Sequence, residues 1–348
     1  MSRRSLALLL LLSAFWGASY LFIKVALEDV FSAWSIVSIR TALAALVLVP
    51  LAAKLGVLGS LRGRLGPIVV LALVQVAGPL TLIGLGEEHI SSSLTGILVA
   101  TAPIFTFLLA FALSGEQRDS PTALAGVAIG IVGVGMLLGV DAGGGGGAIA
   151  GGLMVISAAF GYAVAAWYLK RNLAGVQPVA TVAGTQVVAA LVTLPLGLTH
   201  IPDSAPALDA VASLLTLGII CTGIAFVIFH SLVASDGPSR ASLVGYIAPV
   251  FSIFYGVVLL DEAFTGWTAA GLVLILGGSW LAAGGELPAR RRDVAAAGEP
   301  HGGAEAAFLE GGAEGGDRVA SRPAVARVGR VVGNEVDLEG TPRLEHSG

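Results

Sequence analysis

Ten long apolar runs occupy most of this chain, and they constrain its fold more than any other feature. Their approximate bounds are 6–27, 34–53, 67–86, 92–113, 121–140, 148–169, 178–198, 208–232, 240–260 and 265–284. Each run is close to the roughly 20 residues that a helix needs to cross a bilayer. The runs are continuous rather than alternating, which argues against a transmembrane barrel. Because only 12% of residues are charged, too few polar side chains exist to cover a water-facing surface. The sequence therefore predicts an all-α membrane protein with ten transmembrane helices.

The chain also contains an internal duplication. Ser93–Glu116 returns as Ser239–Glu262 at an offset of 146 residues, and each copy is an apolar run that contains a proline and ends in a glutamate. Other markers recur at nearly the same offset: Trp16-Gly17 with Phe160-Gly161, and Pro50 with Pro195. Such symmetry indicates two copies of one structural unit. We expect a first repeat at residues 1–140 and a second repeat at 141–284, with five spans each.

The distribution of lysine and arginine predicts the orientation of these repeats. With the N-terminus inside, every loop that carries lysine or arginine is cytoplasmic, and the charged residues of the outer loops are all acidic, Glu87 and Glu88 among them. Both termini then lie in the cytoplasm, at a plasma or inner membrane. Five spans are an odd number, so the second repeat enters the membrane inverted relative to the first. Residues 285–348 hold few large apolar residues and predict a disordered cytoplasmic tail.

The order of several markers over about residues 5–284 resembles the drug/metabolite transporter superfamily, EamA type. The markers are Trp16-Gly17, Lys24, Arg40, Pro103 with Gly115-Glu116, Pro249 with Glu262, and the glycine-rich fifth and tenth runs. The resemblance implies a ten-helix inverted-repeat transporter with a central cavity. It also implies small organic substrates, often amino acids or other metabolites, frequently moved outward.

We therefore predict a secondary transporter that exports small organic metabolites, amino-acid-like or amphipathic, by alternating access between the repeats. Drug efflux and metabolite uptake by the same fold are alternatives. A polytopic membrane enzyme is the alternative outside transport, but it would need clustered His, Asp or Glu at membrane depth, and the sequence offers only isolated ones. Since HExxH, GxSxG and phosphate-loop motifs are absent, we expect no enzyme, cofactor or metal, and no basic patch indicates nucleic-acid binding. The expected partners are a small-molecule substrate and the lipid bilayer.

Apart from Arg240 at the first position of the ninth run, Lys24 and Arg40 are the only lysine and arginine inside apolar runs. A charge in hydrocarbon is costly, which makes both candidates for substrate binding. Arginine suits bidentate capture of a carboxylate. The alternative is that both side chains extend to the outer surface and meet Glu28 and Asp29. No Asp or Glu lies in the middle of a span, which weighs against a proton antiporter driven by a membrane carboxylate.

Polar and aromatic residues complete the predicted substrate site. Gln75 and Gln186 lie inside apolar runs, where each must hydrogen-bond another helix or line a wet cavity. The remaining candidates are aromatic side chains that suit the apolar parts of a ligand: Trp16, Tyr20, Tyr162 and Tyr246. His230 is expected at the boundary of the eighth span, and a proton relay is the alternative.

Prolines and span-ending glutamates mark the fourth and ninth spans. Pro103 and Pro249 each remove a backbone hydrogen bond within a span, so we expect bends there that either act as hinges or only shape the helices. Glu116 and Glu262 close these spans, where we expect contacts with loop amides.

Glycines mark one face of the fifth span and one face of the tenth, at Gly126, Gly130, Gly133, Gly135, Gly139, Gly271, Gly277 and Gly278. Small residues let helices approach closely. These faces predict packing inside the chain and leave open a homodimer through spans five and ten.

Overall fold

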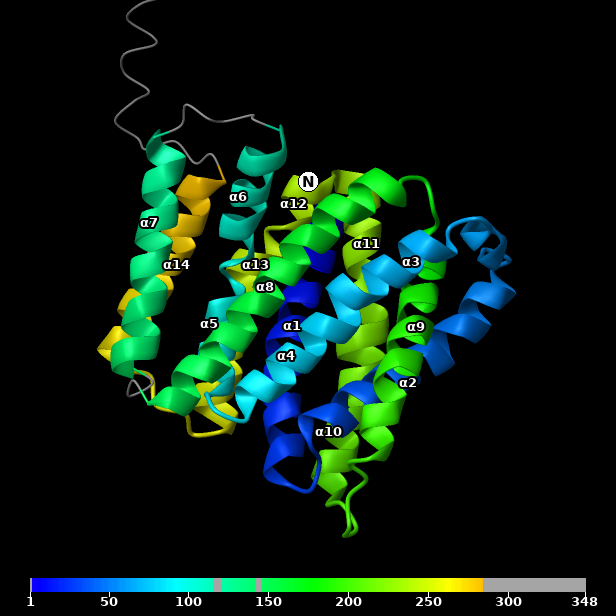
Figure 1. The fold of residues 1–348 in the computed structure, drawn as a ribbon, viewed down its shortest axis with the longest axis horizontal. Coiled ribbons are helices and arrows are strands. Elements are labelled where there is room, and N and C mark those ends of the chain that lie inside the picture. Colours follow the sequence, from blue (N-terminus) through cyan, green and yellow to red (C-terminus); the bar gives the residue numbers. More distant parts are fainter. Residues whose placement is uncertain (1, 115–120, 142–144, 284–348) are drawn as a thin grey trace, which may run out of the picture. The chain divides into compact units, whose positions relative to one another are not determined.

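The structure is a computed structural model that describes residues 2–114, 121–141 and 145–283. Within these ranges all regular structure is helical, as Figure 1 shows. Eight helical segments are long and apolar enough to cross a membrane, and α13 and α14 are shorter apolar helices. The prediction of an all-α protein with ten spans is therefore confirmed.

The first five spans follow one another with short connections. The first two are the single helices α1 (Arg3–Glu28) and α2 (Ala33–Lys54), and the 3-10 turn η1 (Leu58–Leu61) follows them. The third span is continuous but changes type along its length: α3 (Leu65–Leu71), the π-helix η2 (Ala72–Ala77) and α4 (Gly78–Glu87). The fourth is α5 (Ser92–Val99) with α6 (Ala102–Ser114), and the fifth is α7 (Pro121–Met136) with the π-helix η3 (Leu137–Asp141).

The second five spans repeat this plan. The sixth and seventh spans are α8 (Gly146–Asn172) and α9 (Pro178–Leu198). The eighth again has a π-helix in its middle: α10 (Leu208–Gly218), η4 (Ile219–Ile224) and α11 (Ala225–Asp236). The ninth is α12 (Pro238–Ala241) with α13 (Val244–Leu259), and the tenth is α14 (Gly266–Ala282). The third and eighth spans thus each contain a π-helical segment, a feature that is frequent at functional sites.

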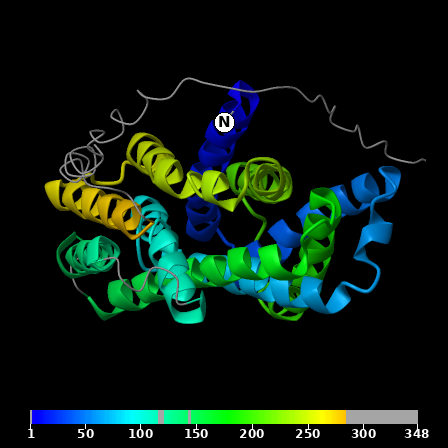
Figure 2. The same ribbon diagram turned by 90° about the horizontal axis from the view of Figure 1, so that it is seen from above.

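Contacts between the repeats follow a two-fold pattern. Helix α2 packs on α9, α5 on α13, and α7 on α14, and each of these pairs joins equivalent spans. Two further pairs are equivalent when the repeats are exchanged: α1 with α13 corresponds to α8 with α6, and α4 with α8 corresponds to α11 with α1. Figures 1 and 2 both show α7 and α14 side by side. The protein interior is therefore largely the seam between the repeats.

One hydrogen bond shows that the repeats run in opposite directions. Nη1 of Arg64, at the start of the third span, donates to the carbonyl oxygen of Asn172, at the end of the sixth, over 3.1 Å. The third span starts at the end of the membrane where the first span starts. The sixth span finishes at that same end, so it runs opposite to the first.

The glycine-rich faces of α7 and α14 pack on each other within the chain. A Cβ added to Gly126 would lie 2.6 Å from the carbonyl oxygen of Gly278, and one added to Gly133 would lie 2.9 Å from Cβ of Leu274. The predicted close packing inside the chain is therefore present at these positions. It is absent at Gly135, Gly139 and Gly277, where an added Cβ would meet no atom within 4 Å, because these glycines face away from the contact.

The interruption of the fourth span precedes its proline. Helix α5 ends at Val99, and Pro103 is the second residue of α6. A proline is tolerated in the first turn of a helix, where its missing N–H has no intrahelical partner in any case. Pro249 instead lies inside α13. The two prolines thus occupy different positions in their helices, and their role as hinges remains a prediction.

Candidate functional site

Arg40 is buried in the interior and anchored by two hydroxyl groups from other spans. Its side chain is 2% exposed. Nε donates to Oγ1 of Thr222 on η4 over 3.0 Å, and Nη2 donates to Oγ of Ser19 on α1 over 3.1 Å. Nη1 is buried and has no hydrogen-bond partner in the described part of the chain. The expectation that Arg40 extends outward to Glu28 and Asp29 is therefore wrong, because hydroxyls of α1 and η4 hold it inside.

Several ionisable side chains surround this guanidinium. Four lie within electrostatic range of it: Tyr20, Glu87, Tyr162 and Cys221. They come from α1, α4, α8 and η4, so residues from both repeats converge on one place. We call the following set the central polar cluster: Ser19, Tyr20, Lys24, Arg40, Glu87, Tyr162 and Thr222. It unites four of the eight predicted binding residues.

Lys24 joins the cluster through the backbone of α4. Its Nζ donates to the carbonyl oxygen of Glu87 over 3.1 Å. The predicted surface partner Asp29 is engaged elsewhere, since its Oδ2 accepts from the backbone N–H of Ala207 over 3.1 Å. The alternative of an outer-surface anchor is thus not what the structure shows for Lys24 either.

Glu87 is the residue that sequence reasoning missed. We expected it in an outer loop, but it is the last residue of α4 and is 0% exposed. Neither of its carboxylate oxygens has a hydrogen-bond partner among the described residues. The carboxylate interacts electrostatically with Lys24, Glu262 and Arg40. A signal was present in the sequence, because Glu87 follows Leu80 and Ile83 at helical spacing and therefore shares their buried face.

A second group of predicted residues lies around His230. Nε2 of His230 and Oε1 of Gln75 are 3.2 Å apart and hydrogen-bonded. The His230 ring contacts Phe226 and Phe229, with ring centroids 6.4 and 5.9 Å apart, and Trp16 packs on the same two phenylalanines at 5.7 and 5.2 Å. Trp16 and Gln75 are therefore linked through His230 and the two phenylalanines, and neither is part of the central polar cluster. His230 is buried and lies within α11, which continues to Asp236, so its expected place at the boundary of the span is wrong.

Gln186 and Tyr246 belong to neither group. Gln186 on α9 is 0% exposed, and its two amide atoms have no hydrogen-bond partner within the described ranges. The hydroxyl of Tyr246 on α13 is likewise buried and unpaired there. Both are polar groups that a ligand or water would satisfy.

Glu262 binds the start of a helix in the other repeat. Its carboxylate accepts from the backbone N–H groups of Ser92 and Ser93 over 2.7 and 2.9 Å, and from the Ser93 hydroxyl. The first N–H groups of a helix lack intrahelical partners and favour a negative charge. Glu262 therefore contacts backbone amides, but these belong to the first turn of α5 and not to a loop as predicted. Glu116 lies outside the described residues.

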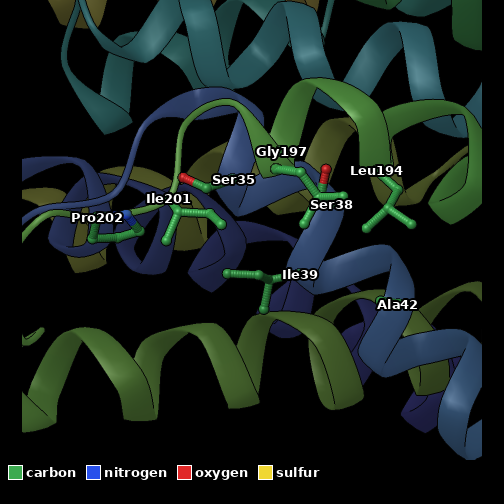
Figure 3. A pocket seen from close by; sticks show the side chains of 9 residues that line it. Ser35, Ser38, Ile39, Ala42, Leu194, Gly197, Ile201 and Pro202 are labelled. Carbon is green, nitrogen blue, oxygen red and sulfur yellow. The ribbon is translucent and has the colours of Figure 1, made fainter.

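A shallow apolar hollow lies elsewhere, between α2, α9 and the segment after α9 (Figure 3). Its volume is about 220 Å³, and Ile39, Leu194 and Ile201 contribute to its wall. The two serines in its wall are already bonded: Ser38 Oγ donates to the carbonyl oxygen of Thr193, and Ser35 Oγ to that of Ser32. This hollow therefore offers an apolar surface to a ligand, and its two serine hydroxyls already donate their hydrogen bonds within the protein.

The central polar cluster suits the binding of a charged organic group. It contains two cationic side chains, one free guanidinium nitrogen and one unpaired carboxylate, next to two tyrosines. In the described ranges no group of three or more His, Cys, Asp or Glu is placed to hold a metal ion.

Comparison with known proteins identifies the family. The family model for the EamA-like transporter family matches residues 3–139 and again 149–284. A probable amino-acid metabolite efflux pump of Salmonella typhimurium is 28% identical over 293 residues, covering 81% of this chain and 95% of that protein. An uncharacterized transporter of Archaeoglobus fulgidus is 26% identical over 273 residues, covering 77% and 94%.

Further relatives agree with this assignment. A probable terminal-alkyne amino-acid exporter of Streptantibioticus cattleyicolor is 28% identical over 262 residues, covering 71% of this chain and 82% of the exporter. A solved crystal structure aligns with a TM-score of 0.61 at 22% identity, covering 81% of this chain and 97% of the other, which shows the shared fold. The chain belongs to the EamA-like transporter family, and it is a multi-pass membrane transporter rather than an enzyme.

Proposed function

We propose that this transporter exports small amino-acid-like metabolites and that Arg40 binds their carboxylate. The observation that carries this proposal is the free, buried Nη1 of Arg40, whose other nitrogens are held by Ser19 and Thr222. A guanidinium held rigidly with one donor free is a preorganised partner for a carboxylate. The adjacent Tyr20 and Tyr162 would contact the rest of the ligand.

Alternating access by the two repeats is the mechanism that this arrangement supports. The cluster combines α1, α2 and α4 of the proposed first repeat, residues 1–140, with α8 and η4 of the proposed second repeat, residues 141–284. A site formed from both repeats opens to one side or the other when one repeat rocks against the other. Relatives named as an amino-acid metabolite efflux pump and an amino-acid exporter favour the outward direction.

The test is an untargeted comparison of metabolites in medium and cytosol, using cells with and without this protein. We expect one class of carboxylate-bearing metabolites to accumulate outside only when the protein is present. In a further arm, Arg40→Ala should lower the export rate by about tenfold or more, because a lost hydrogen bond to a charged group costs roughly 1.5–3 kcal/mol.

Arg171→Ala is the matched control. Arg171 is an exposed arginine whose guanidinium lies 5.3 Å from the Trp167 ring centroid, at the end of α8 and outside the cluster. Export should survive this change. If Arg40→Ala exports normally, Arg40 is structural and the site lies elsewhere. Accumulation inside cells would replace export by uptake, and efflux restricted to foreign amphipathic compounds would indicate drug transport.

A homodimer through spans five and ten would need the faces of α7 and α14 that do not meet inside the chain. A Cβ added at Gly135, Gly139 or Gly277 would meet no atom within 4 Å, so these positions offer the room for such a contact. Sedimentation of the purified protein in detergent tests this part of the proposal.

A further inference from the structure

The carboxylate of Glu87 is the least satisfied charged group in the described interior. It is 0% exposed, and both of its oxygens lack hydrogen-bond partners among the described residues. Neither Lys24 nor Arg40 places a nitrogen within the 4.0 Å of an ion pair, although both interact with it electrostatically. A buried carboxylate without partners is strongly unfavourable, so this position calls for a cation that binds it or a proton that neutralises it.

The charged and titratable groups that face Glu87 define what it can bind. From α1 these are Tyr20 and Lys24, from α2 Arg40, and from the segment before α14 Glu262. Tyr162 of α8 lies beside Arg40 and Tyr20. The Glu262 carboxylate is held by the start of α5, and the Lys24 ammonium is bonded to the carbonyl oxygen of Glu87. Among the fully buried polar atoms of the cluster, Nη1 of Arg40 and the two oxygens of Glu87 are the ones without a hydrogen-bond partner in the described ranges.

These free atoms are opposite in charge, buried in one cluster and not paired with each other. A zwitterion carries the complementary charges, with a carboxylate for the guanidinium and an ammonium for the carboxylate. We propose that Glu87 is an exchange site that holds either a proton or the ammonium group of the substrate. The exchange half of this proposal rests on the proposed function, whereas the proton half depends only on Glu87.

The consequence is an exchange of one proton for one substrate zwitterion, which moves one net positive charge in the direction of the proton. A proton taken from water on one side converts the carboxylate to a neutral acid. Release of that proton on the other side restores the anion, which then accepts the substrate ammonium. Because proton and ammonium compete for the same oxygens, the proton crosses the membrane in one half-cycle and the substrate crosses in the other. An inward proton gradient would thereby drive export.

The experiment is infrared difference spectroscopy of the purified full-length protein in lipid nanodiscs, titrated from acidic to alkaline pH. The expected result is a carboxylic-acid C=O stretching band that disappears on titration, is absent in Glu87→Gln and persists in Glu88→Gln. Glu88 is the exposed neighbour of Glu87 and serves as the matched control. If Glu87→Gln does not fold, Glu87→Asp keeps the acid and should shift the band. A wild-type band that Glu87→Gln leaves unchanged, or the lack of a titrating band, overturns the proposal.

The exchange is tested in the same samples with an equimolar mixture of the standard amino acids at a pH where the acid band is present. Binding should displace the proton and reduce the band in wild type and in Glu88→Gln. A band that titrates but ignores the amino acids overturns the exchange. The proposed function fails separately, if the metabolite comparison shows no export while the band still titrates.

Discussion

Single polar residues in the interior differ in how completely they are satisfied. Arg40 has two of its three nitrogens bonded, and Gln75 is paired with His230, whereas Gln186 has no partner for either amide atom in the described ranges. An unsatisfied polar group buried away from water costs about 1–3 kcal/mol. Binding of a ligand or of water to the unpaired amide would offset this cost. A substitution of Gln186 can therefore distinguish an effect on stability from an effect on transport.

Gln186→Leu should therefore raise the stability of the protein by about 1 kcal/mol or more, because it replaces an unpaired amide by an apolar group of similar size. The matched change Gln75→Leu should lower stability, since it leaves buried His230 without its partner. Thermal unfolding in one detergent measures both. A destabilised Gln186→Leu would mean that the amide is satisfied in the membrane, and a stabilised variant that loses transport would place Gln186 in the substrate path.

At the scale of helices, backbone contact between α7 and α14 is the tightest constraint. A Cβ on Gly278 would lie 2.5 Å from the carbonyl oxygen of Gly126 and 2.6 Å from the backbone nitrogen of Gly130. Backbone atoms cannot turn aside as a side chain can. The close packing of α7 and α14 therefore requires glycine, whose side chain is a single hydrogen, at position 278.

Gly278→Ala should destabilise the protein by about 1–3 kcal/mol, the usual cost of forcing extra atoms into a packed interface. Gly277→Ala provides an adjacent control on the same helix, because a Cβ there meets nothing within 4 Å and alanine favours helix by up to about 1 kcal/mol. Thermal unfolding in detergent compares the two variants. Equal behaviour would show that the faces of α7 and α14 do not meet as the structure has them.

Another element-scale contact links the two repeats. Glu262 precedes α14 in the second repeat and satisfies the first amides of α5 in the first repeat. Ser252 of α13 adds a hydrogen bond from its hydroxyl to the carbonyl oxygen of Ser92 over 3.0 Å. The start of α5 is therefore fixed by α13 and by the segment that follows it.

For the whole molecule, the placement of lysine and arginine predicts how the chain sits in the membrane. The segment between α8 and α9 follows Lys170 and Arg171 and should face the cytoplasm, whereas the segment between α9 and α10 carries Asp203 and should face outside. Alkaline phosphatase inserted after Ser204 should be active, and a fluorescent protein inserted after Gly175 should fluoresce. The reverse pattern would contradict the predicted orientation in the membrane without contradicting the fold.

The sequence could predict most properties that depend on one segment and the bilayer, and the positions of Glu87 and His230 along their spans are the exceptions. Ten spans, two repeats and their opposed directions follow from run lengths, duplication and charge, because backbone groups in lipid must be satisfied within each helix. Lys24, Arg40, Tyr20 and Tyr162 stood out for the same local reason, as polar side chains in apolar runs. The family and its transport class follow from the same patterns.

Only the tertiary structure decided which polar groups meet. Arg40 is hydrogen-bonded to Thr222, 182 residues away in the sequence, and Gln75 to His230, 155 residues away. Glu87, which we expected in a loop, is buried in the interior. The rotation of each helix about its axis sets these pairings. Apolar runs encode that rotation weakly, because lipid and protein interior are both apolar and both accept the same side chains.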